Sequence, residues 1–410
     1  MKKYIVLLLI LLMAVCTLLS CVDGGDKGGD VTEGVTSAET DKDEPKSKHI
    51  DDLTDTSKFY KFVKFDLPDD LRQAAVDYMY EQASVEWVCG ESFGVKEEWA
   101  HWGINLDFQK GVKYTGQPYA NSQVNVALFK RVIKDGKYSS PSTSWDAVHG
   151  SQCVSSILNA LQQVMIVAGW SYTLNPGSTA FQGVKLGDYE VEVKAVNSET
   201  PTRQVCEKNG TDKMYASYAL LQKGDTLLTS NDWVHARMVV EVTVEKNAAG
   251  VINPRRSIVK CIEQTNSFDS TRKDVKTTWF VDHVYTFEKL YTDGYLPATF
   301  EEYSTGVSHI PYITLDAENK PNVLAKEMIA GNVRSNYPVR YVVLEIFDES
   351  GKIAKEYTVR GAMNDYAYGL RKYSYNLFGD GLEKGNYTFV LTAGIAAGEI
   401  EFERVQFTVE

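Results

Sequence analysis

The spacing of hydrophobic and polar residues along the chain predicts a mixture of helices and strands. After the turn at Pro68, apolar residues recur at helical spacing over residues 69–84. A second amphipathic helix is expected to begin at Cys153, directly after a turn. Its apolar face would be formed by Val154, Ile157, Leu158 and Leu161. A short helix over residues 287–291 would precede an extended exit at 296–299.

The segments between and after these helices show the spacing of strands. Four strands are expected beyond the central helix, at residues 189–195, 225–228, 235–244 and 257–263. A helix packed on such a meander predicts an α+β fold with the helices on one side of the sheet. From residue 310 to 410 the pattern is strand and turn alone, which predicts a β-sandwich of immunoglobulin type.

The first 55 residues have a different pattern. Two lysines precede a continuous apolar stretch at residues 5–19, which is too short for a comfortable membrane span and predicts a signal peptide over residues 1–20. The sequence Leu-Leu-Ser-Cys that closes the stretch resembles a lipobox, so Cys21 is expected to carry diacylglycerol after cleavage. An ordinary signal peptide that happens to contain cysteines is the alternative. Residues 21–55 have almost no large apolar side chain and are expected to form a disordered tether.

The length and net charge of the chain indicate how many domains it has and which partners it is expected not to bind. The roughly 355 residues after the tether are too many for one average domain, so we expect two domains, at 56–308 and 309–410. The net charge of −12 argues against a nucleic-acid partner. The sequence has no Gly-rich phosphate loop, HExxH pair or repeated CxxC, so no nucleotide, metal or other cofactor is expected.

Cys153 is the candidate with the most distinctive setting. At the start of a helix, free amide groups and the helix dipole favour a thiolate. His235, at the start of the strand that follows a Gly-Asp turn, is the candidate base, with His149 as a rival four residues before the cysteine. A thiol beside an imidazole is the arrangement of nucleophilic acyl transfer. The four exported cysteines, Cys89, Cys153, Cys206 and Cys261, also allow a disulfide interpretation.

Two segments of this region resemble the NlpC-like cell-wall peptidases, which are papain-type cysteine hydrolases. They are GSQCVSSI at residues 150–157 and LQKGDTLLTSNDWVHARMVV at 221–240. GQPY at 116–119 and the ending at 277–306 are similar to further elements of the family. The resemblance departs from the family pattern at Gln152, where an acidic residue is usual, and in the long gap between Tyr119 and the cysteine.

The resemblance implies a papain-like catalytic domain with defined roles for its residues. Cys153 would be the nucleophile and His235 the base, and Glu263 in KCIEQT would orient the histidine, although a carboxylate there could also be merely solvated. Tyr119 and Gln152 would bind the oxyanion or the substrate. Aromatic residues before the nucleophile could line a groove or pack the core.

The function implied by the resemblance is cleavage of an amide bond in peptidoglycan stem peptides. The enzyme would be a monomeric lipoprotein of the cell envelope, anchored outside the cytoplasmic membrane or at the cell surface. Two alternatives remain open at this point. One is an inactive or binding-only lipoprotein that interacts with wall, carbohydrate or peptide, and the other is a transglutaminase-like acyl transferase.

Overall fold

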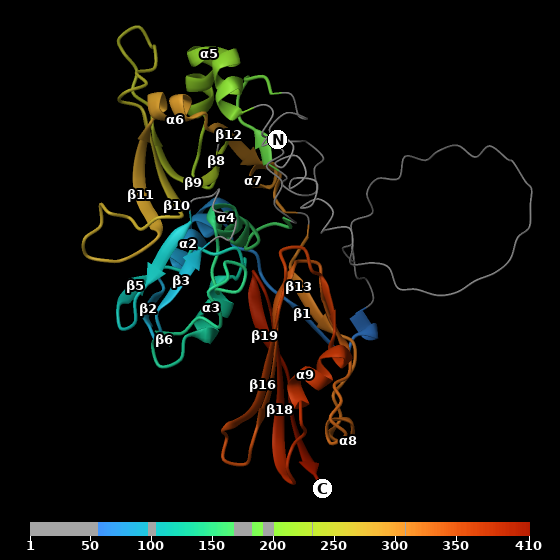
Figure 1. Cartoon of the computed structure of the whole chain (residues 1–410). Coiled ribbons are helices and arrows are strands. Elements are labelled where there is room, and N and C mark those ends of the chain that lie inside the picture. The colour runs from blue at the N-terminus through green and yellow to red at the C-terminus, as the bar shows by residue number, and fades with distance from the viewer. Residues whose placement is uncertain (1–55, 97–103, 168–182, 192–200, 232, 308) are drawn as a thin grey trace, which may run out of the picture. The chain divides into compact units, whose positions relative to one another are not determined.

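A computed structural model describes residues 56–96, 104–167, 183–191, 201–231, 233–307 and 309–410 (Figure 1). These residues all belong to one unit, Ser47–Glu410. They form an α+β structure with several separate sheets. None of the helices in these ranges is long and apolar enough to cross a membrane. The predicted signal peptide, lipidation site and tether lie outside the described residues.

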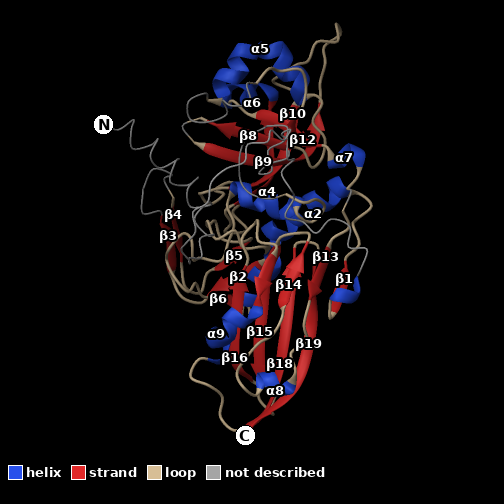
Figure 2. Cartoon of the chain, turned by 90° about the vertical axis from the view of Figure 1, so that its right-hand side faces the viewer, coloured by secondary structure: helices blue, strands red, loops and turns tan. Residues whose placement is uncertain are grey.

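A six-stranded sheet with the strand order β11-β10-β9-β8-β12-β7 carries the candidate site (Figures 1 and 2). All its neighbouring strands are antiparallel. The strands are β7 (Gly183–Lys185), β8 (Thr226–Ser230), β9 (Val234–Thr243), β10 (Ile258–Gln264), β11 (Trp279–Thr286) and β12 (Leu296–Phe300). Three of them match strands predicted from the sequence, at 225–228, 235–244 and 257–263.

Two helices form the layer that packs on this sheet near the site. Helix α4 (Cys153–Leu161) is buried along its whole length and packs against β9, β10 and α2 (Leu71–Ser84). Asp70 caps α2 by accepting a hydrogen bond from the Gln73 N–H at 2.9 Å. Both helices begin close to where their apolar spacing predicts. The buried face of α4 therefore fixes its N-terminus against the sheet.

The other helices of this region lie around the sheet and beside the small sheets. They are α3 (Val126–Val132), α5 (Thr202–Tyr218), α6 (Phe287–Asp293) and α7 (Glu302–Thr305). Helix α6 confirms the short helix predicted at 287–291, with Phe287 and Leu290 buried. Helix α5, which has non-helical backbone at Gly210, was not predicted because its apolar residues follow no clear helical stripe.

The aromatic residues before the nucleophile pack the core. They surround a three-stranded sheet of β2 (Glu86–Cys89), β5 (Lys113–Thr115) and β6 (Lys137–Tyr138), beside the pair β3 (Phe93–Lys96) and β4 (Asn105–Phe108). Trp87 stacks on Tyr114 with ring centroids 4.9 Å apart, and Phe93 stacks on Phe108 at 4.7 Å. These buried rings favour the packing interpretation over a substrate groove. Trp99 and Trp102 lie outside the described residues.

The C-terminal region forms two four-stranded antiparallel sheets that share one apolar core. One sheet contains β1 (Lys61–Lys64), β13 (Tyr312–Leu315), β14 (Asn332–Ser335) and β17 (Ala367–Gly369). The other contains β15 (Val339–Phe347), β16 (Ile353–Arg360), β18 (Gly385–Ile395) and β19 (Gly398–Val409). The short helices α8 (Pro321–Leu324) and α9 (Ser374–Phe378) lie between these strands in sequence. Strand β1 joins the first sheet although it precedes the site region in sequence.

Two expectations differ from the structure. Residues 189–191 form no strand because the chain leaves the sheet after Gly187, whose φ is +101°, and residues 192–195 are outside the described ranges. The expected exit at 296–299 is instead strand β12, which lies inside the sheet between β8 and β7. Its Ala298 pairs with both neighbours. Strand pairing thus makes residues 296–300 part of the sheet, although their sequence had indicated only an extended chain.

Candidate active site

The backbone just before Cys153 is shaped by tight packing. A Cβ added at Gly150 would lie 2.1 Å from the carbonyl oxygen of Pro118, so only glycine fits there. Gln152 is extended and is the N-cap residue of α4. Its N–H donates to Ser155 Oγ at 2.8 Å, which anchors the first turn. Cys153 is therefore the first residue of the helix, as the sequence predicts.

A buried network ties the segment 116–119 to the sheet and to the residues before the nucleophile. Gly116 has φ +82°, and an added Cβ would lie 2.3 Å from Cδ1 of Trp279. The carbonyl of Gln117 accepts from Trp279 Nε1 at 3.0 Å and from Gln264 Nε2 at 2.9 Å. Ser151 Oγ donates to Gln264 Oε1 at 2.6 Å. These bonds fix the start of α4 relative to β10. Sequence reasoning did not identify Gln117, Ser151 or Gln264 as members of this network.

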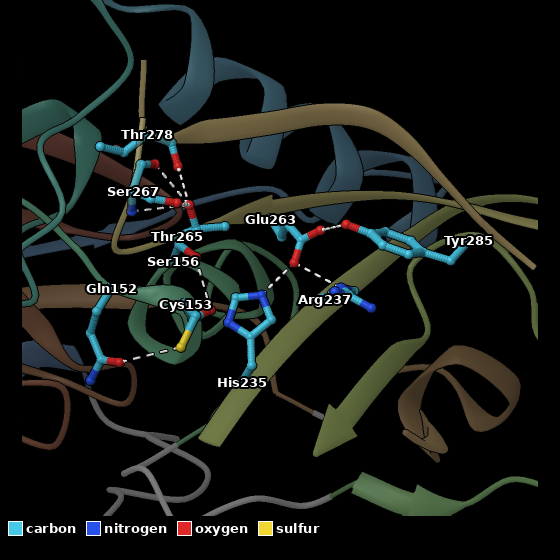
Figure 3. Close-up of polar contacts among 10 residues, drawn as sticks. All are labelled: Gln152, Cys153, Ser156, His235, Arg237, Glu263, Thr265, Ser267, Thr278 and Tyr285. Carbon is cyan, nitrogen blue, oxygen red and sulfur yellow. Dashed lines mark hydrogen bonds and ion pairs between the residues drawn. The ribbon is translucent and has the colours of Figure 1, made fainter. Parts of the chain in front are cut away.

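The structure brings Cys153, His235 and Glu263 together (Figure 3). His235 lies on β9 and Glu263 on the neighbouring strand β10. His235 Nε2 hydrogen-bonds to Glu263 Oε2, and the imidazole lies beside the Cys153 sulfur, whose pKa it lowers. In Figure 3 the sulfur lies on the side of the ring that carries the other nitrogen, Nδ1. The order carboxylate, imidazole, thiol is the one expected from the sequence.

The electrostatics of the three residues favour a thiolate–imidazolium pair. Burial raises the pKa of Cys153, but the hydrogen bond and charge of His235 outweigh it, so the pKa is lowered. Burial lowers the pKa of His235, but the charge of Glu263 and the bond to Cys153 raise it to about 9. The proton therefore resides on the imidazole at neutral pH. Cys153 is 3% exposed and His235 9%, so the pair is only weakly screened by water.

Tyr119 and Gln152, the predicted oxyanion or substrate ligands, both contact the thiol. A hydrogen bond from the Tyr119 side chain contributes to the lowered pKa of Cys153, as does one from the backbone of Ala236. The Cys153 thiol donates to Gln152 Oε1 at 3.6 Å. For a thiolate, the same amide turned by half a rotation would present its NH₂ group instead. Tyr119, the backbone of Ala236 and Gln152 can thus supply donors to a charged sulfur.

Glu263 has two further partners that were not predicted from the sequence. Arg237 Nε donates to Glu263 Oε2 at 2.8 Å, and the Tyr285 hydroxyl donates to Oε1. Burial raises the pKa of Glu263, but the charges of Arg237 and His235 and the hydrogen bonds it accepts lower it to about 2. The carboxylate is 1% exposed, which excludes the solvated role. A signal for Arg237 was present, since it follows His235 by two residues on one strand.

The rival residues lie in other environments. His149 faces the Tyr138 hydroxyl at 3.3 Å, and burial lowers its pKa to about 4. The four cysteines of the described chain, Cys89, Cys153, Cys206 and Cys261, are free and buried, so the disulfide alternative is wrong for these residues. Burial raises the pKa of Cys206 to about 12 and also raises those of Cys89 and Cys261. Cys153 alone of the four has a lowered pKa.

Among the residues that the structure describes, there is no cluster of three or more His, Cys, Asp or Glu side chains placed to hold a metal ion. The arrangement around Cys153 is a set of proton donors and acceptors rather than a ligand cage. It can form a nucleophile, stabilise an anion and supply a proton. Cys21, the predicted lipidation site, lies outside the described residues.

We expect iodoacetamide to label Cys153 selectively in the folded protein at pH 6 to 7. The thiolate is the reactive form, and among the four described thiols only at Cys153 do the neighbouring groups outweigh the effect of burial. The labelled residue would be identified by peptide mass spectrometry after short exposure. Labelling of Cys89, Cys206 and Cys261 should require denaturant. Equal labelling of all four thiols under native conditions would contradict the lowered pKa.

Comparisons with known proteins give little information about this site. No protein-family model matches the chain, and no curated protein matches it. A crystal structure of dimeric latent PorU from Porphyromonas gingivalis is similar at a TM-score of 0.15 and 10% sequence identity. The match covers 42% of this chain and 20% of that chain. A likeness at this level carries no argument about fold or function, so a functional assignment must rest on the residues of the site and their geometry.

Proposed function

We propose that the protein is a cysteine hydrolase that cleaves an amide bond through Cys153, His235 and Glu263. The observation that carries the proposal is the imidazole of His235, hydrogen-bonded to Glu263 and placed beside a thiol at a helix N-terminus whose pKa it lowers. Shifted pKa values in a compact group of titratable residues are typical of active sites. The opposite shifts of Cys153 and His235 supply both a nucleophile and an acid at neutral pH.

The chemistry follows from these positions. The Cys153 thiolate attacks the amide carbonyl carbon, and the C–S bond forms as the carbonyl oxygen becomes an oxyanion. The amide groups of the first turn of α4 and the Gln152 side chain lie where they could stabilise that charge. His235 then donates its proton to the leaving nitrogen, the C–N bond breaks and a thioester remains.

The second half of the reaction releases the enzyme. Neutral His235 accepts a proton from water, and the resulting hydroxide attacks the thioester carbonyl. The C–S bond breaks, the thiolate is restored, and the proton on His235 re-forms the ion pair. Glu263 keeps the imidazole in the orientation that serves both steps, because it holds Nε2 throughout.

The proposed fold class of the catalytic region is papain-like, and the proposed substrate is a peptidoglycan stem peptide. The fold proposal is supported by a helix that begins at the nucleophile and packs on an antiparallel sheet that supplies the base and the third residue. The substrate proposal is supported by the resemblance of the segments around Cys153 and His235 to NlpC-like peptidases. The C-terminal β-sandwich is proposed as an immunoglobulin-like accessory domain.

Incubation of the purified protein with defined muropeptides in H₂¹⁸O tests this function. Hydrolysis is expected to yield two fragments, with one ¹⁸O atom in the new carboxyl group, detected by mass spectrometry. Products that carry an added amine instead of water would indicate acyl transfer. Intact muropeptides together with a reactive Cys153 would favour a binding-only protein and would contradict the proposed hydrolysis.

We further propose that Cys21 anchors the protein in a membrane of the cell envelope, outside the cytoplasm. Cys21→Ser is expected to move the protein from the detergent phase into the soluble exported fraction. Each buried methylene contributes about 0.8 kcal/mol, so diacylglycerol holds a protein firmly where one chain would not. The measurement is phase partition of wild type and variant, with the mature N-terminus determined. A wild-type N-terminus beyond Cys21 would contradict the anchor.

A further inference from the structure

We propose that Arg237 and Tyr285 are positioning residues that keep the Glu263 carboxylate charged and directed at His235, and so maintain the reactive Cys153 thiolate. The inference rests on the proposed function, because it concerns the same thiol. Neither residue belongs to the three residues proposed to react. Both act through Glu263, whose two oxygens they hold.

Strand geometry places Arg237 beside the histidine. Successive side chains of a strand point to opposite faces, so His235 and Arg237 on β9 share one face. Ile262 on β10 pairs with Met238 on β9, and the two strands are antiparallel, so one residue forward on β10 and one residue back on β9 Glu263 comes opposite Arg237. His235 Nε2 and Arg237 Nε both bond to Oε2 of Glu263. The base and the arginine thus share one oxygen atom.

Two aromatic rings hold the guanidinium in place. Cζ of Arg237 lies 3.7 Å from the ring centroid of Tyr285 and 4.1 Å from that of Tyr295. A planar, delocalised cation suits such a stack, whereas a lysine ammonium would have neither the plane nor the Nε geometry. Arg237 is 8% exposed. Because the two rings restrict the guanidinium, Nε of Arg237 is held in one position relative to the Glu263 carboxylate.

The charges around Glu263 show what Arg237 contributes. The titratable groups that face the pair are His235 on β9, Cys261 on β10, Tyr285 on β11, and Tyr295 just before β12. Arg237 and the imidazolium are the cations among them, and burial keeps the pKa of the tyrosines and of Cys261 high. With Arg237 present, the charges of thiolate, imidazolium, carboxylate and guanidinium sum to zero. Without it, a buried net negative charge would remain.

A buried negative charge is relieved by taking up a proton. Whichever group of the cluster accepts that proton, the midpoint for thiolate formation moves to higher pH. An arginine that only packed against the strand would leave this midpoint unchanged. The pH dependence of the thiol therefore separates a positioning role from a structural one.

The experiment measures the rate of Cys153 carboxamidomethylation as a function of pH in the full-length protein, by intact mass spectrometry. Arg237→Met is expected to raise the midpoint by about one to three pH units, the range for loss of an opposite charge in close contact. Tyr285→Phe keeps the ring on Arg237 but removes a donor to Glu263 Oε1 and should raise the midpoint by a smaller amount. Arg237→Lys, which keeps the charge, should fall nearer the wild type.

Arg72→Met is the matched control. Arg72 also pairs with a buried carboxylate, at 2.7 Å from Asp225 Oδ1, and also stacks on a tyrosine ring, at 4.2 Å from the centroid of Tyr303. Asp225 precedes the first residue of β8, whereas His235 pairs near the other end of that strand. Loss of the Arg72 guanidinium should therefore lower the stability of the protein without moving the pH midpoint of Cys153 alkylation.

An unchanged midpoint in folded Arg237→Met overturns the proposal, as does a shift of equal size in Arg72→Met. Folding of Arg237→Met is judged by circular dichroism and thermal unfolding. If that variant does not fold, Tyr285→Phe becomes the test, and an unchanged midpoint in Tyr285→Phe overturns the proposal. The assay uses iodoacetamide and no substrate, so absence of amide hydrolysis would reject the proposed function while leaving this inference to be decided by the midpoints. If muropeptides are cleaved, Arg237→Met should lower kcat with little change in KM.

Discussion

Cys153→Ala is expected to abolish amide hydrolysis while the protein remains folded. Loss of a covalent nucleophile typically lowers kcat by a factor of about 10⁴ to 10⁶. The side chain is small, so its removal should change the free energy of unfolding by about 1 kcal/mol. The measurements are turnover of a defined muropeptide and thermal unfolding of both proteins. Because the thiolate raises the pKa of His235, the variant's imidazole should also titrate at lower pH.

Cys89→Ala is the control for this substitution. Cys89 is also buried, at 1% exposed against 3% for Cys153, but its thiol donates to the carbonyl of Glu91 and burial raises its pKa. Its loss should leave turnover unchanged. Retained activity in a folded Cys153→Ala protein would rule out covalent catalysis at this residue and direct attention to the binding-only alternative.

The sequence was sufficient to place Cys153 and His235 because their signals are local, whereas Glu263 was predicted from the resemblance of its segment to the NlpC-like family. Cys153 begins a helix whose apolar face is evident, and His235 is the second residue of β9, a strand that follows a Gly-Asp turn and is rich in apolar residues. Each signal predicts an element and the end of that element at which the side chain lies. When the helix packs on the sheet, the N-terminus of α4 and the start of β9 are brought close together in most arrangements.

The supporting residues could not be predicted because they depend on register. Strand β10 has irregularities between Lys260 and Cys261 on one side and between Cys261 and Glu263 on the other. Such bulges change the direction in which later side chains point, and periodicity does not reveal them. They determine that Glu263 meets both Arg237 and Tyr285. The bond between Ser151 and Gln264 depends on the same register and was missed for the same reason.

Long-range strand pairing was the other feature beyond sequence reasoning. Strand β1 pairs with β13, about 250 residues later in the chain, and its four residues give no local sign of that partner. Pro297 marks residues 296–299 as extended, but pairing with β8 and β7 is what makes β12 part of the sheet. The sequence therefore predicts elements more reliably than it predicts their neighbours.

Glu263→Gln is expected to lower both activity and stability, the latter in a pH-dependent way. Glutamine cannot hold the imidazolium by charge, so kcat should fall by a factor of about 10² to 10⁴. The variant also leaves Arg237 buried without its carboxylate, which typically costs about 3 to 5 kcal/mol. Guanidinium unfolding of wild type and variant, repeated at several pH values, measures the second effect.

The sign of the pH dependence follows from the pKa of Glu263. The folded value of about 2 lies below the ordinary 4.5, so ionised Glu263 contributes stability above pH 4.5 that is lost as the pH falls toward 2. The difference in unfolding free energy between wild type and Glu263→Gln should therefore shrink by about 3 kcal/mol over that interval. Asp225→Asn provides a control of opposite sign. Burial raises the pKa of Asp225, so its ionised form opposes folding, and the advantage of wild type over Asp225→Asn should decline as the pH rises above about 4. A pH-independent difference for Glu263→Gln would show that the carboxylate is not held in its charged form, and the pair with His235 would then lose its electrostatic basis.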